Sequence, residues 1–165
     1  MLKKIGIGLA IALLLIQFIQ IDKTIIADET YHMNTKYQIP EDVSKILKNA
    51  CNNCHSNSAN YPWYSYIQPV GWWLQNHINE GRQKLNFSKF TNASIARQNH
   101  KFEEIIEMVK EKEMPLPSYT YLGLHPEAKM TDAQRVTITS WAQSQMEYLA
   151  TQFPPDSLLL KKRIQ

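Results

Sequence analysis

The chain is poor in three features, and each shortage excludes a class of protein. Cysteine occurs only twice in 165 residues, which leaves a four-cysteine structural zinc site without its ligands. Five glycines and few alternating apolar runs leave little room for a β-sheet, so we expect an all-α fold. The formal charge is only +3, and lysine and arginine form no basic stripe, so no nucleic-acid partner is expected.

Both cysteines stand in one short run, Cys51-Asn52-Asn53-Cys54-His55. The pattern C-x-x-C-H is typical of covalent haem attachment. Cysteines three positions apart lie roughly on one face of a helix, so both sulfurs can reach the two vinyl groups along one porphyrin edge. His55 would then be the proximal ligand of the iron, and one axial position would remain for a distant part of the chain.

Two other interpretations of this run are weaker. A thioredoxin-like redox pair normally opens a helix after a strand, with its first thiol activated there; here the pair is expected to close a helix. A simple disulfide gives no reason for the adjacent histidine. The run therefore predicts one haem c, held by thioether bonds through Cys51 and Cys54.

The N-terminus has the pattern of an export signal, because Lys3 and Lys4 precede an apolar run over 5–21. We expect residues 1–27 to be retained as a signal-anchor helix, because Ile25-Ile26-Ala27 offers no clean cleavage site. The alternative is a cleaved signal peptide. Either outcome places the remainder on the periplasmic side of a bacterial inner membrane, where haem attachment is completed.

Residues 28–38 are expected to form a linker, in which His32 and Met33 are poor candidates for iron ligands. Apolar spacing then predicts four helices in a domain over 39–150, at about 40–55, 69–81, 101–112 and 132–149. The first is expected to carry Cys51 and Cys54 on its apolar stripe, and Gly81 is expected to cap the second. Residues 151–165 are expected to form a tail, with Lys161-Lys162-Arg163 solvated or near anionic lipid.

Aromatic and polar residues after the motif are candidates for haem contacts. Tyr61, Trp63 and Tyr64 are expected to line one haem edge, the alternative being an apolar cluster under a loop. The inner face of the second helix is expected to hold Val70, Trp73, Leu74, His77 and Ile78. His77 is interpreted as hydrogen-bonded in the core, as a propionate partner, or as the second axial ligand. Arg82 is a further propionate candidate.

Met114 is the favoured sixth ligand. It stands in a loop stiffened by Pro115 and Pro117, so its thioether can be held at one place. A sulfur donor opposite an imidazole raises the reduction potential, as suits an electron carrier. The alternatives are that Met114 fills a gap in the core, and that His77, His100, His125 or an open position completes the coordination.

These segments together resemble a known family. The small haem-binding domain family of c-type cytochromes carries, in order, five motifs that stand here at 51–57, 61–64, 81–88, 113–115 and 125–126. Members often have tryptophan where Phe90 stands. The resemblance implies a cytochrome c-like helical fold, one covalent haem, His55 as proximal ligand and Met114 as distal ligand.

The expected function is that of a monohaem cytochrome passing single electrons between envelope redox proteins. Its expected partners are those redox proteins, the haem maturation machinery and, through the N-terminal segment, the membrane. The alternative is a haem enzyme or ligand sensor, for example a peroxidase-like one, with an open or displaceable distal position. A domain that merely retains haem for stability is a third possibility.

Overall fold

The computed structural model describes residues 1–25 and 28–161, and within them the protein is helical without any strand. The predicted all-α class is confirmed. The helices are α1 Leu2–Ile16, α2 Glu41–Ala50, α3 Asn52–His55, α4 Val70–Lys84, α5 Ile95–Lys110, α6 Pro117–Thr120 and α7 Asp132–Gln152. Short 3-10 turns connect them: η1 Met33–Thr35, η2 Trp63–Tyr66, η3 Phe87–Asn92, η4 Tyr121–Gly123, η5 Pro126–Ala128 and η6 Pro155–Ser157.

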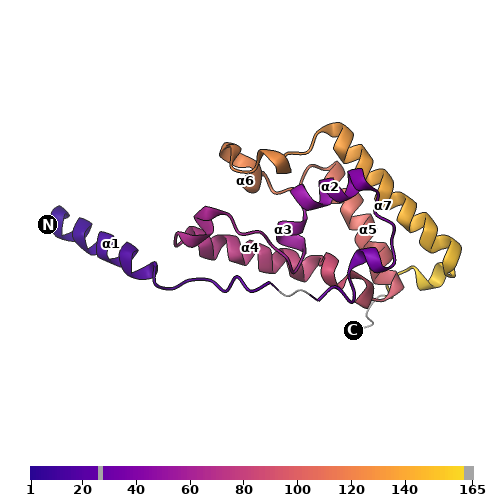
Figure 1. The fold of residues 1–165 in the computed structure, drawn as a ribbon, viewed down its shortest axis with the longest axis horizontal. Coiled ribbons are helices and arrows are strands. Elements are labelled where there is room, and N and C mark those ends of the chain that lie inside the picture. Colours follow the sequence, from indigo (N-terminus) through magenta and orange to yellow (C-terminus); the bar gives the residue numbers. More distant parts are fainter. Residues whose placement is uncertain (26–27, 162–165) are drawn as a thin grey trace.

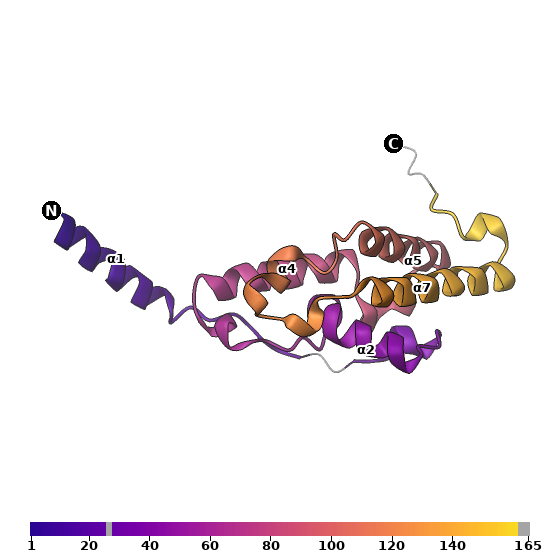
Figure 2. The same ribbon diagram turned by 90° about the horizontal axis from the view of Figure 1, so that it is seen from above.

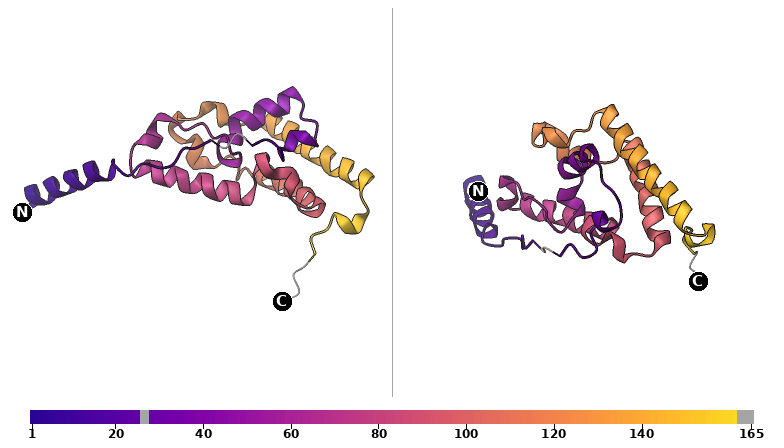
Figure 3. Two further views of the ribbon diagram at one scale, coloured as in Figure 1. Left: turned by 60° about the horizontal axis from the view of Figure 1, so that its bottom comes forward. Right: turned by 45° about the vertical axis from the view of Figure 1, so that its right-hand side comes forward.

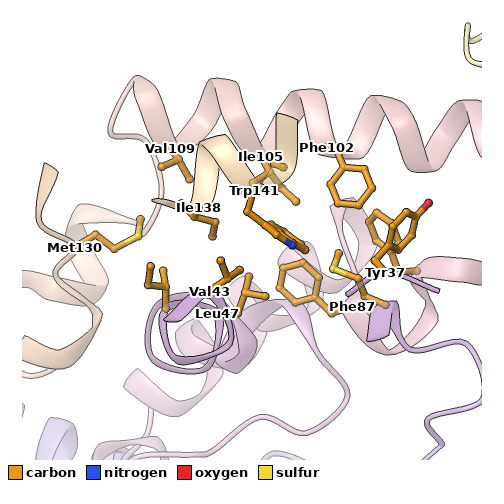
Figure 4. Packing of buried hydrophobic residues seen from close by; sticks show 14 of the residues in the cluster. Tyr37, Val43, Leu47, Phe87, Phe102, Ile105, Val109, Met130, Ile138 and Trp141 are labelled. Carbon is orange, nitrogen blue, oxygen red and sulfur yellow. The ribbon is translucent and has the colours of Figure 1, made fainter. Parts of the chain in front are cut away.

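The main core lies where α2, α5 and α7 meet (Figure 1). Each of these helices turns an apolar stripe inward, as the spacing of its residues predicts. Figure 4 shows Val43 and Leu47 of α2 facing Phe102, Ile105 and Val109 of α5 and Ile138 and Trp141 of α7. The indole of Trp141 also donates a hydrogen bond to the Gln38 carbonyl, 3.0 Å away. This packing holds α2 in place, and α2 leads directly into the cysteine motif.

The helix that was predicted over 40–55 is in fact two helices. Cys51 leaves helical geometry, with φ −126°, so α2 ends at Ala50 and α3 begins at Asn52. The short α3 contacts both α2 and α4, and Figure 3 shows it between them. The break turns the motif away from the α2 axis and towards α4.

The segment predicted to be a linker joins the core instead. Met33 is fully buried, and Tyr37 is 2% exposed. The Tyr37 ring packs edge-on against Phe90 and Phe102, and its hydroxyl donates to Gln98 Oε1 at 2.6 Å. The linker prediction was wrong here, because two isolated apolar residues give no periodic signal even when both are buried.

Two helix ends and the C-terminal tail also differ from the predictions. α4 continues past Gly81 to Lys84, and α5 starts at Ile95, where the Ser94 hydroxyl accepts from the Arg97 N–H. At the C-terminus, Phe153 and Leu158 pack against the core, so part of the predicted tail belongs to the domain. α7 begins at a capping box formed by Thr131 and Gln134, in agreement with the predicted helix start at about 132. Lys161 is exposed, while Lys162 and Arg163 lie outside the described residues.

α1 stands apart from the packed helices as a separate rod (Figure 2). It is 15 residues long and buries none of them. Across residues 1–25 and 28–161, no helix combines the length and apolarity needed to cross a membrane. The prediction that Ile25-Ile26-Ala27 offers no clean cleavage site falls partly outside the described residues, because the structure does not describe Ile26 and Ala27.

Candidate haem-binding site

The motif residues come from a single helical turn. Cys51 is the residue before α3, and its carbonyl accepts hydrogen bonds from the N–H groups of Cys54 and His55, at 3.1 and 3.0 Å. Cys51 packs against the main core, and Cys54 packs against a second apolar cluster that contains Leu74 and Ile78 of α4. Neither cysteine is in a disulfide. Two thiols and one imidazole are thus held together on one rigid turn.

The His55 ring is oriented by two backbone carbonyls. Its Nδ1 lies 3.0 Å from the Gly81 carbonyl and 3.0 Å from the Leu85 carbonyl. Because neither carbonyl can donate, the proton belongs on Nδ1 and the lone pair is left on Nε2. Burial lowers the pKa of His55, which keeps the imidazole neutral. A neutral ring whose other nitrogen is fixed by hydrogen bonds is the state in which histidine binds a metal.

Gly81 makes this orientation possible. A Cβ atom at position 81 would lie 2.8 Å from the Cys54 carbonyl oxygen and 3.3 Å from its Cβ. Only glycine therefore lets α4 approach α3 this closely. The sequence prediction of a helix cap at Gly81 was wrong, because the residue lies within α4 and serves the contact with α3.

The two thiols have properties unlike those of a redox-active pair. Burial, together with the neighbouring Cys54, raises the pKa of Cys51 to about 12. Burial also raises the pKa of Cys54, although the nearby Arg82 charge works in the opposite direction. A thioredoxin-like pair needs a lowered pKa, so the surroundings of these cysteines argue against that interpretation.

The segment that follows the motif is bound to the end of α4. Arg82 Nε donates to the Ser56 carbonyl at 2.7 Å, and Asn86 Nδ2 donates to Asn57 Oδ1 at 2.9 Å. Asn57 is 5% exposed, and its Nδ2 atom has no hydrogen-bond partner among the described residues. A cavity of about 860 Å³ opens beside these residues. Five cationic side chains line it: Arg82, Lys84, Lys89, Arg97 and Lys101.

The structure brings some of the predicted haem contacts to the motif and leaves others away from it. Tyr61 and Tyr64 pack on the cluster that includes Cys54, and Tyr61 donates to Gln75 Oε1 at 2.9 Å. Trp63 is 70% exposed and touches Tyr64 edge-on.

The predicted inner face of α4 is correct only in part. Leu74 and Ile78 are buried, whereas Val70 and Trp73 are 42% and 46% exposed. His77 is not hydrogen-bonded in the core. Its Nδ1 lies 2.9 Å from the Trp73 carbonyl on a half-exposed surface, and its ring lies against that indole. α4 is covered on one narrow side only, so the outer half of the predicted stripe meets solvent.

A part-buried polar network beside Cys54 was not predicted. His125 is 8% exposed; its Nε2 lies 2.6 Å from the Tyr64 hydroxyl and its Nδ1 lies 3.0 Å from Glu127 Oε1. The Tyr119 ring stacks on His125 at 4.0 Å, and Asn53 Nδ2 donates to the Tyr119 hydroxyl at 2.8 Å. Burial raises the pKa of Tyr64 to about 12. The network ties η2, α6 and the turn at His125 to α3 through two hydrogen bonds that span 61 and 66 residues of sequence, a separation at which spacing carries no signal.

Met114 lies half-buried in the loop between α5 and α6. Its N–H donates to the Met108 carbonyl at 3.1 Å, and its own carbonyl accepts from Arg135 Nη1 at 2.9 Å. The same Arg135 nitrogen donates to the Val109 carbonyl at 2.8 Å. The backbone of the loop is thus fixed by α7. The role of Met114 as an iron ligand stays a prediction.

Comparison with known proteins agrees with this chemistry. A family model described as a haem-binding domain matches residues 11–144. The chain belongs to this haem-binding domain family. The cytochrome c peroxidase Ccp of Escherichia coli is 29% identical to it over 109 residues, which are 64% of this chain and 23% of that protein. The matched region is thus less than a quarter of the length of this relative. No solved structure matches the present chain.

The donor set fits the group that the family binds. The thiols of Cys51 and Cys54 are free, the His55 imidazole is neutral with Nε2 available, and all three stand on one turn. The unpartnered Asn57 amide and the Arg82 guanidinium are polar donors close to that turn. These side chains have the chemistry that would hold a haem and its carboxylates.

Proposed function

We propose that this haem-binding domain is a monohaem c-type cytochrome that carries single electrons. Cys51 and Cys54 would hold the haem through thioether bonds, and His55 would be the proximal ligand. The observation that supports this most strongly is the pair of carbonyls that accept from His55 Nδ1, because they leave Nε2 with its lone pair as a neutral ligand atom. A haem bound there supplies a one-electron iron couple.

Met114 is the proposed distal ligand. The Met114 backbone is held on both sides, since its N–H donates to the Met108 carbonyl of α5 and its carbonyl accepts from Arg135 of α7. A loop with little backbone freedom loses little entropy when its side chain binds a metal. A filled distal position would leave no site for a small molecule on the iron, which favours electron transfer over catalysis.

We also propose a location and partners. Residues 1–27 would attach the protein to the inner membrane of a bacterium, with the domain on the periplasmic side, where the haem maturation machinery completes attachment. Redox partners would dock on the basic cavity lined by Lys84, Lys89 and Arg97, which borders the Leu85 segment that holds His55. Positive charge there would attract an acidic partner surface and speed its association at low salt.

Intact mass tests the covalent attachment. The protein is expressed with a competent haem maturation pathway, beside Cys51→Ala, Cys54→Ala and the double variant. The wild type is expected to gain the mass of one haem and to stain for haem after denaturation. Each single variant should lose one of the two thioether bonds to the haem. The double variant should contain no covalently bound haem and should not stain. A colourless wild type of unshifted mass would contradict the proposal.

The distal ligand is tested by spectroscopy of the oxidised protein. The wild type is expected to show the charge-transfer absorption of a methionine–iron bond, and Met114→Ala should lose it together with part of the reduction potential. Met108→Ala is the matched control, because Met108 is also half-buried at the end of α5. An unchanged spectrum in Met114→Ala would remove this residue from the ligand set.

A peroxidase-like enzyme is the second candidate, and two observations favour it. The relative from Escherichia coli is named a cytochrome c peroxidase, and a Tyr64–His125–Glu127 hydrogen-bonded series lies beside Cys54. A histidine held by a carboxylate can move a proton during cleavage of an O–O bond. Rapid binding of cyanide or CO by the wild type, with peroxide turnover lost in His125→Gln, would favour this candidate over the first.

A further inference from the structure

The middle of the chain contains a long stretch without carboxylate, lysine or arginine side chains. Between Lys48 and Glu80 the sequence has no aspartate, glutamate, lysine or arginine. Five large apolar or aromatic residues of this stretch are nevertheless exposed. They form what we call the aromatic patch, on η2 and the start of α4: Trp63 at 70%, Tyr66 at 58%, Ile67 at 46%, Val70 at 42% and Trp73 at 46%.

The N-terminal segment joins the domain at this patch. Gln17 and Gln68 exchange two hydrogen bonds of 2.9 Å, from Gln17 Nε2 to the Gln68 carbonyl and from the Gln68 N–H to Gln17 Oε1. The Trp72 indole donates to the Ile19 carbonyl at 3.0 Å. Lys23 holds its ammonium 3.4 Å from the centre of the Tyr66 ring. The end of α1 is therefore fixed beside the patch, and Figure 1 shows both at the same end of the molecule.

α1 itself is apolar on every side and buries none of its residues. Lys3 and Lys4 are its only charged side chains. A helix that is hydrophobic all round is stable only when an apolar medium surrounds it. The large apolar side chains of α1 are exposed, from Leu2 to Leu15, and so are Phe18 and Ile19 just after it.

We propose that the aromatic patch is a second membrane contact, which rests in the headgroup region of the lipid surface that takes up α1. Tryptophan and tyrosine prefer this region, because their rings are apolar and their N–H and O–H groups remain hydrated. The patch has no charge to desolvate, and Lys23 lies at its edge, where it can meet lipid phosphates. The inference rests on the proposed membrane attachment of residues 1–27.

The contact would fix the height of the haem site above the lipid. α4 starts in the patch at Val70 and reaches Gly81, which holds His55. At 1.5 Å per residue, this is about 16 Å along the helix. The domain would then lie against the membrane instead of moving freely on its N-terminal segment, and the orientation of the site towards membrane-bound partners would be set.

Side-chain oxidation measures the contact directly. The full-length haem-loaded protein is reconstituted into vesicles of phosphatidylethanolamine and phosphatidylglycerol, recovered by flotation, and exposed to hydroxyl radicals. Oxidation of each residue is divided by its rate in the unfolded protein. We expect Trp63 and Tyr66 to react at least about fivefold more slowly than Tyr121 and Tyr148, which are 69% and 44% exposed on other elements.

Two triple variants test the same contact by vesicle partitioning. The patch variant is Tyr66→Ser, Ile67→Ser, Val70→Ser, and the matched control is Tyr121→Ser, Val136→Ser, Tyr148→Ser. The patch variant is expected to bind vesicles about tenfold more weakly, because binding scales with buried apolar area, while the control binds as the wild type does. Circular dichroism and the haem spectrum verify that both are folded.

The possible failures are distinguishable. Absence of flotation would overturn the membrane attachment and this inference together. Flotation with Trp63 and Tyr66 oxidised as fast as Tyr121 would overturn the aromatic patch alone. Protection that disappears when the protein is diluted in excess lipid would show that a second copy of the chain, and not lipid, covers the patch.

Discussion

At the scale of single residues, the site depends on contacts that leave one reactive atom free. Two carbonyls occupy Nδ1 of His55, and the absence of a side chain at Gly81 lets those carbonyls come close. The thiol of Cys51 is held in its neutral form by burial, which raises its pKa to about 12. The same burial that suits a thioether would disfavour a thiolate.

The raised pKa of Cys51 makes the stability of the haem-free protein depend on pH. The folded state keeps the thiol proton when the unfolded state begins to lose it, so the stabilisation is complete below about pH 9 and is lost as the pH rises towards 12. We expect the free energy of unfolding to be about 1 kcal/mol lower at pH 10 than at pH 8 because of this thiol. Urea titrations at both pH values measure it.

Cys51→Ala, also haem-free, is the control, since it lacks the thiol and keeps the tyrosines. Burial also raises the pKa of Tyr64 and Tyr119, so part of the alkaline loss should remain. An equal loss in wild type and variant would contradict the assignment to Cys51. Haem attachment should reduce the loss as well, because a thioether sulfur carries no proton.

At the scale of elements, one arginine couples three parts of the site. Arg135 of α7 donates to the carbonyls of Val109, at the end of α5, and of Met114, in the loop that follows. α7 in turn begins at a capping box, in which Thr131 and Gln134 fix its first turn. The position of the proposed distal ligand therefore depends on α7 as well as on its own loop.

Replacing Arg135 with glutamine should release the Met114 loop. We expect a loss of about 1–3 kcal/mol in the free energy of unfolding, because two buried carbonyls lose a charged donor. If Met114 binds the iron, its charge-transfer absorption should weaken as well. Arg97→Gln is the control, since Arg97 is exposed on α5. If Arg135→Gln loses stability and the charge-transfer absorption is unchanged, Arg135 has only a structural role.

At the scale of the whole molecule, the N-terminal third has two functions. Residues 1–23 form the apolar α1 and its attachment to the aromatic patch. Met33 and Tyr37 complete the core between η3 and α5. Lys23 and Met33 are ten positions apart, so little chain separates the segment that is proposed to contact lipid from the segment that enters the core.

Tyr37→Phe tests whether this segment belongs to the domain. The substitution leaves Gln98 Oε1 buried without its 2.6 Å donor, which should cost about 1–3 kcal/mol in chemical denaturation of the haem-loaded protein. Tyr31→Phe, at a residue that is 45% exposed, should change stability by less than about 0.5 kcal/mol. Equal effects would mean that the segment acts as a linker after all.

The sequence by itself determined the haem-binding motif and the helical class. Five consecutive residues predict haem attachment because their reactive atoms lie close together along the chain, and the stripes of α2, α5 and α7 follow from the helical period. Only the tertiary structure decided the contacts between residues that are far apart in the sequence. These are the hydrogen bonds from His55 Nδ1 to backbone carbonyls, the Tyr64–His125 hydrogen bond, and the burial of Met33 and Tyr37. Such contacts depend on which surfaces meet after folding, and no local spacing records that.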